Sequence, residues 1–119
     1  MCALAIELLL MEKYFQQIVA HTERGERVAS AVVVSSRGST PQDVGARMLF
    51  FADGTTWGTV GGGCVEADVR AEARRVLADG KGRSIAVDLV DDVRGEGDVC
   101  GGTLEVLLES WDGVTRAVG

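Results

Sequence analysis

The chain has 119 residues, so we expect one domain over residues 1–119, built around one hydrophobic core. Hydrophobic residues make up 46% and charged residues 25%, which excludes a disordered, collagen-like or membrane-embedded class of protein. The net charge of -6 argues against a protein that binds the phosphate backbone of nucleic acids.

The first predicted element is an amphipathic helix over residues 4–22, because apolar side chains recur there at three- and four-residue steps. Its apolar start contains Glu7 and lacks a basic segment and a cleavage site, so it does not read as a signal peptide. No other stretch approaches the ~20 apolar residues of a membrane span. His21 lies on the polar edge of this helix, where we expect it to be solvated.

Residues 28–35 predict a buried central strand on which the helix packs, because Ala31-Val32-Val33-Val34 is apolar on both faces. The polar loop that follows contains Arg37 and Gln42, and Arg47 comes just after it. Guanidinium and amide groups suit a phosphate or a polar heterocycle. The alternative is that both arginines are surface residues that pair with the acidic excess.

Residues 47–51 and 55–60 predict a hairpin, and a second helix follows over residues 65–77. Between them stand Gly61, Gly62 and Gly63, followed by Cys64 and by Glu66 in the first helical turn. A strand-to-helix junction of this kind exposes backbone N–H groups and can hold an anion, and a thiol there becomes more acidic. The alternative is a tight packing turn with Cys64 as a small buried side chain.

Residues 84–90 and 103–109 predict two more strands, separated by an acidic, glycine-rich segment that contains Cys100, Gly101 and Gly102. Three widely spaced cysteines without a CxxC pair indicate neither a disulfide framework nor a zinc site, which favours a reducing cytoplasm. The element order predicts an α+β or α/β domain in which one mixed β-sheet is covered by two main helices.

Several motifs occur in order over about residues 10–110, and they are Gly38-Ser39-Thr40-Pro41, Gly45-Ala46-Arg47-Met48-Leu49, Asp53-Gly54, the segment 58–66, and Cys100-Gly101-Gly102. Together they resemble the XdhC/CoxI family, whose members are accessory proteins of molybdenum hydroxylases such as xanthine dehydrogenase and carbon monoxide dehydrogenase. The resemblance implies a carrier, with no turnover of its own, that binds molybdenum cofactor (molybdopterin) as cargo. It also implies two partners: a cysteine desulfurase that sulfurates the cofactor and an apo molybdenum hydroxylase that receives it.

In that family the cysteine of the Cys-Gly-Gly segment is associated with cofactor binding, which implies that Cys100 approaches molybdenum. The family often has two adjacent cysteines there, and Val99 stands in place of the first. Because the cofactor carries a phosphate, we expect the glycine turn with Arg37 or Arg47 to hold that group. The candidate binding residues are Arg37, Gln42, Arg47, Gly61, Gly62, Gly63, Cys64, Glu66, Cys100, Gly101 and Gly102.

Many family members continue into a C-terminal Rossmann-like domain, whereas this chain ends at Gly119, so we expect the N-terminal domain standing alone. A separate Rossmann-domain protein or a second copy of the chain would then complete the site, and exposed strand edges favour a homo-oligomer. Two other functions stay open. One is an interaction module for the hydroxylase or the Rossmann partner that never contacts cofactor. The other is a thiol redox or sulfur-transfer protein that uses Cys64 and Cys100.

Overall fold

The computed structural model describes residues 2–38, 44–60, 63–89 and 102–112. Within these ranges, two helices and five strands confirm the expected α+β class, and each predicted element is present with bounds shifted by only a few residues. The elements are α1 (Cys2–Glu23), β1 (Val28–Arg37), β2 (Arg47–Phe51), β3 (Thr56–Gly58), α2 (Gly63–Asp79), β4 (Arg83–Leu89) and β5 (Gly102–Trp111).

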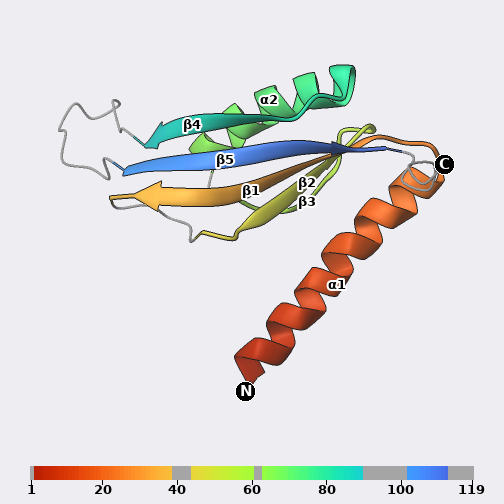
Figure 1. Ribbon diagram of the computed structural model, residues 1–119, viewed down its shortest axis with the longest axis horizontal. Helices are drawn as coiled ribbons and strands as arrows, with labels where there is room; N and C mark the ends of the chain where they lie inside the picture. Colours follow the sequence, from red (N-terminus) through yellow and green to blue (C-terminus); the bar gives the residue numbers. More distant parts are fainter. Residues whose placement is uncertain (1, 39–43, 61–62, 90–101, 113–119) are drawn as a thin grey trace.

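The strands form one sheet in the order β3-β2-β1-β5-β4, with β1 at its centre as its apolar sequence predicts (Figure 1). Every pairing among these strands is antiparallel, where a mixed sheet was expected. The reason is topological. The strands that α2 connects, β3 and β4, run in the same direction but lie at opposite edges of the sheet, so they never become neighbours.

One face of the sheet is covered by α2 (Figure 1). Its apolar residues recur at helical spacing and pack on alternate residues of β1, β2 and β5, which places the main core between this helix and the sheet. Small side chains in the centre, such as Ala31 and Ala73, let the two layers approach closely. The fully buried valines of α2 that form this contact are Val65, Val69 and Val76.

The opposite face is covered only in part, because α1 packs on it through its C-terminal half. Tyr14 and Ile18 are buried against Val28, Leu49 and Phe51 in a second, smaller apolar cluster. The remainder of α1 extends away from the sheet (Figure 1). The expectation that two helices cover the sheet therefore holds fully for α2 and only for the second half of α1.

His21 anchors this end of α1 and is not solvated as expected. Its ring stacks on Phe51, with centroids 3.9 Å apart and planes 10° from parallel, and its side chain is 14% exposed. Its Nδ1 atom lies 2.9 Å from Glu26 Oε1, which also accepts a hydrogen bond from Arg24. These two partners, His21 foremost, hold the pKa of the Glu26 carboxyl below its ordinary value. The cluster fixes the turn between α1 and β1.

The turn that follows β3 requires a glycine at position 58. This residue has φ +81°, and a Cβ on it would lie 2.5 Å from the carbonyl oxygen of Arg47. We expect Gly58→Ala to lower the free energy of unfolding by about 2–3 kcal/mol, since both backbone strain and separation of β3 from β2 contribute.

Gly54→Ala is the matched control, because Gly54 has φ +93° but a Cβ on it would meet no described atom within 4 Å. We expect it to cost only the backbone strain, about 1 kcal/mol. Urea unfolding of both variants measures the difference. Equal losses would show that the close approach at Gly58 does not matter.

Candidate functional site

Three of the connecting segments leave the sheet at the same end, which we call the loop end. Arg37, the last residue of β1, pairs with Thr103, and Leu89, the last residue of β4, pairs with Gly102. Because the pairings are antiparallel, β1, β3 and β4 all run toward this end, although β2 begins opposite Val32, five residues before the end of β1. Figure 1 shows the tips of β1 and β4 beside the start of β5, with α2 starting toward that end. The segments 38–46, 59–62 and 90–101 all depart from here.

The start of α2 provides the clearest local geometry of the loop end. The helix begins at Gly63, two residues earlier than predicted, and Glu66 lies in its first turn. Thr59 Oγ1 donates a hydrogen bond to Glu66 Oε2, which ties the segment after β3 to the helix. The first backbone N–H groups of a helix have no intrahelical acceptor and carry partial positive charge. This terminus is therefore chemically suited to an anionic group.

Arg47 does not face the start of α2. Its neighbour Met48 is buried in the cluster under α2, so Arg47, the adjacent residue of the strand, faces the opposite side of the sheet. There its guanidinium carbon lies 5.2 Å from the centre of the Tyr14 ring, over α1. This contact holds α1 to the sheet, and the expected role of Arg47 with the glycine turn stays a prediction because Gly61 and Gly62 lie outside the described residues.

Arg37 is placed differently, at the loop end itself. It is exposed and forms no ion pair with any residue in the described part of the chain. Neighbouring side chains on β1 and β5 are polar, and Ser35 Oγ donates a 3.2 Å hydrogen bond to Glu105. Its pairing partner Thr103 donates a 3.1 Å hydrogen bond to Asp88 on β4. Ser35 and Thr103, which lie beside Arg37, thus each donate a hydrogen bond to a carboxylate. Among the described residues, Arg37 itself has no carboxylate partner.

The other candidates divide between described and undescribed parts of the chain. Gly102 is described and buried, as the first residue of β5. The backbone of Cys64 lies in the first turn of α2, while its side chain is outside the described atoms. Gln42, Gly61, Gly62, Cys100 and Gly101 lie outside the described residues, so they stay predictions.

Sequence reasoning missed Thr59 and Thr103. Each is a polar residue directly beside a glycine of a candidate motif, and this position in the sequence could have identified it. Among residues 2–38, 44–60, 63–89 and 102–112, no group of three His, Cys, Asp or Glu side chains could hold a metal ion. Within the same ranges, neither helix is long and apolar enough to cross a membrane.

Comparison with known proteins gives a family match. Residues 21–91, well over half of the chain, match the model of the XdhC and CoxI family. The chain is 42% identical over 84 residues to the uncharacterized Escherichia coli (strain K12) protein YqeB. This match covers 67% of this chain and 15% of YqeB. A crystal structure described as a xanthine dehydrogenase from Bacillus halodurans aligns with TM-score 0.66 and 37% identity, over 82% of this chain and 29% of that one. The chain therefore spans less than a third of either relative.

The contact between Thr59 and Glu66 yields a prediction about the start of α2. We expect Glu66→Ala to lower the free energy of unfolding by about 0.5–1 kcal/mol, because it removes a hydrogen-bond acceptor and a favourable charge at the helix N-terminus. Glu66→Gln keeps an acceptor oxygen and should lose less. Thermal unfolding measures both variants, and an unchanged Glu66→Ala protein would contradict the assignment.

Proposed function

The chain belongs to the XdhC and CoxI family, and from this membership we propose that it is an accessory protein of a molybdenum hydroxylase. In this proposal it binds molybdenum cofactor as cargo in the cytoplasm, presents it to a cysteine desulfurase for sulfuration, and passes it to an apo-hydroxylase. The solved relative described as a xanthine dehydrogenase supports the link to that enzyme class. The chain itself acts as a carrier and has no reaction of its own.

The observation that carries the proposal is that the three segments with the candidate residues, 38–46, 59–62 and 90–101, all leave the sheet at the loop end. Residues far apart in the sequence, Arg37, Gly63 and Gly102, flank those segments. A ligand with several chemically different parts needs donors from several segments at one place. The antiparallel pairing supports the proposal, because it directs the ends of β1, β3 and β4 toward the same end of the sheet.

The donors at the loop end suit the parts of the cofactor. Its phosphate would lie against the N–H groups at the start of α2 and near the guanidinium of Arg37. The carboxylate of Glu66 can accept hydrogen bonds from the amino group of the pterin. Cys100, two positions before Gly102 in the sequence, is the proposed soft ligand that approaches molybdenum. Gln42, Gly61, Gly62, Gly63, Cys64 and Gly101 complete the proposed site.

A second candidate function, an interaction module, is favoured by a separate observation. Much of α1 extends from the sheet with apolar side chains exposed, among them Ile6, Leu8 and Leu9. An exposed apolar surface of this kind marks a protein contact in many soluble proteins. A Rossmann-domain protein, or a second copy pairing at the sheet edges β3 or β4, stays a prediction.

The first prediction concerns the thiol. We expect the purified chain to bind molybdenum cofactor under anaerobic conditions near one equivalent, and Cys100→Ser to weaken binding at least about tenfold, which is about 1.4 kcal/mol. Co-elution of molybdenum by metal analysis and of the pterin by fluorescence measures this.

Two other cysteines serve as comparisons for that experiment. Cys2→Ser, in the first turn of α1, is the matched control and should bind like the parent chain. Cys64→Ser reports whether the thiol at the start of α2 contributes. Wild-type binding by Cys100→Ser would contradict the role given to Cys100, and no binding by the parent chain would favour the interaction module.

The second prediction separates the two arginines. We expect Arg37→Ala to reduce cofactor affinity by about ten- to one-hundredfold, because a charge-assisted hydrogen bond to phosphate is lost. Arg47→Ala should leave affinity within about twofold and instead destabilise the fold by about 0.5–1 kcal/mol, through loss of its contact with Tyr14. The same titration, with thermal unfolding beside it, measures both effects. Equal affinity losses would show that Arg47 also reaches the cofactor.

A further inference from the structure

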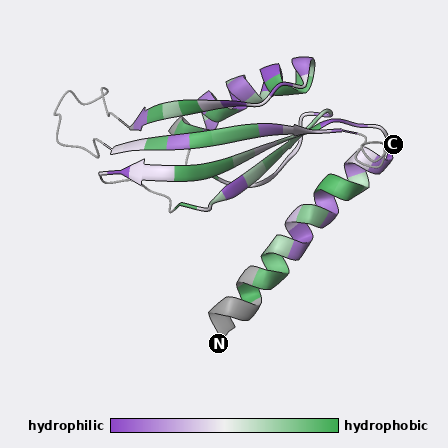
Figure 2. Cartoon of the chain, viewed as in Figure 1, coloured by the Kyte–Doolittle hydropathy of each residue, from purple (hydrophilic) through white to green (hydrophobic). Residues whose placement is uncertain are grey.

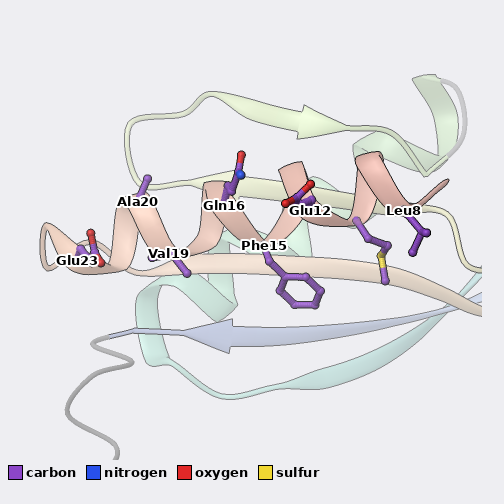
Figure 3. A pocket seen from close by; sticks show the side chains of 8 residues that line it. Leu8, Glu12, Phe15, Gln16, Val19, Ala20 and Glu23 are labelled. Carbon is purple, nitrogen blue, oxygen red and sulfur yellow. The ribbon is translucent and has the colours of Figure 1, made fainter. Parts of the chain in front are cut away.

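One flank of α1, beside the side that packs on the sheet, forms an apolar strip that we call the α1 stripe, made of Leu8, Met11, Phe15 and Val19. Leu8 is 64% exposed, Phe15 43% and Val19 45%. The stripe lines an open pocket of about 680 Å³ along the helix. Figure 3 shows Leu8, Phe15 and Val19 pointing to one side of α1, and Figure 2 shows hydrophobic residues along much of the helix.

Half-buried Met11 borders the side of α1 that packs on the sheet, and the other three residues of the α1 stripe lie farther around the helix. At about 100° per residue, the direction of Leu8, Phe15 and Val19 lies about 80° around the helix from that of buried Ile18. The ring of Phe15 meets Trp111 of β5 at 6.5 Å between centroids in an edge arrangement, and its side chain stays 43% exposed. Folding of the domain therefore leaves these side chains available to another molecule.

The charges beside the α1 stripe indicate what that molecule is. Among the described residues that line the pocket, the charged ones are Glu12 and Glu23, both acidic. A second copy packed antiparallel, the arrangement that keeps the two sheets apart, would set each acidic margin against its own counterpart. Each copy also carries a net charge of -6. Like charges facing each other disfavour self-association along this surface.

We propose that the α1 stripe docks an amphipathic helix of another protein, with apolar side chains on one face and Lys or Arg beside them. The stripe from Leu8 to Val19 is about three helical turns long, the length over which one helix packs against another. Basic residues of the partner pair with Glu12 and Glu23. The surface lies on the face of the sheet opposite α2, so this docking goes beyond the proposed cofactor site and does not depend on it.

The test uses a synthetic helical peptide of about four turns, with leucines on one face and lysines beside them, and a twin in which glutamates replace the lysines. We expect the full chain to bind the lysine peptide and not the glutamate peptide, as measured by fluorescence anisotropy. Leu8→Ser should weaken binding at least about tenfold, and since Leu8 is largely exposed this variant keeps the fold. Glu12→Lys should weaken binding of the lysine peptide and raise binding of the glutamate peptide.

Asp68→Lys, an exposed change of equal charge on α2, is the matched control and should leave lysine-peptide binding within about twofold. Equal loss in Asp68→Lys and Glu12→Lys would overturn the proposal, because binding would then follow net charge alone. Failure of the parent chain to bind the lysine peptide would also overturn it. Analytical ultracentrifugation measures the oligomeric state of the parent chain and of Leu8→Ser. A dimer of the parent chain that Leu8→Ser dissociates would identify a second copy as the occupant and overturn the proposal. Unchanged cofactor binding by Leu8→Ser would separate this result from the proposed function.

Discussion

The pairing of β1 with β2 on one side and β5 on the other is the constraint on which the rest of the structure depends. As the central strand, β1 must be apolar on both faces, and it contributes Ala31 and Val33 to the α2 cluster and Val28 to the α1 cluster. Its register with β5 extends to Arg37 and Thr103. The same pairing therefore holds the two layers together and sets the end of β1 level with the start of β5 at the loop end.

The two faces of the sheet have different chemistry because of this arrangement. The face under α2 is sealed by small and branched side chains, and the helix that seals it begins beside the loop end with its N–H groups available. The opposite face is covered by the second half of α1, where Tyr14, Ile18 and His21 lie. In the first half of α1, the side chains of Ile6, Leu8, Leu9 and Leu10 are exposed to solvent. In our account, cargo binding and partner docking thus use separate parts of one small domain.

Local pattern in the sequence predicted the elements well, because helical and strand periodicity depend on burial of one face. It could not predict the strand order, since the return of β5 to the side of β1 depends on contacts between residues far apart in the sequence. The alternation in Arg47-Met48 shows that the two side chains face opposite ways, but only the structure tells which one α2 covers. Likewise, apolar residues occur all round the start of α1, so periodicity predicted a helix without showing which stripe would stay exposed.

The central claim is that the loop end receives the molybdenum of the cofactor, and anomalous diffraction at the molybdenum absorption edge tests it most directly. Crystals of the chain grown anaerobically with molybdenum cofactor should show one molybdenum peak beyond the ends of β1 and β4 and the start of β5, on the side where α2 begins. A peak on α1 or on the face of the sheet opposite α2, or cofactor density with no contact to the segments at the loop end, would contradict the account.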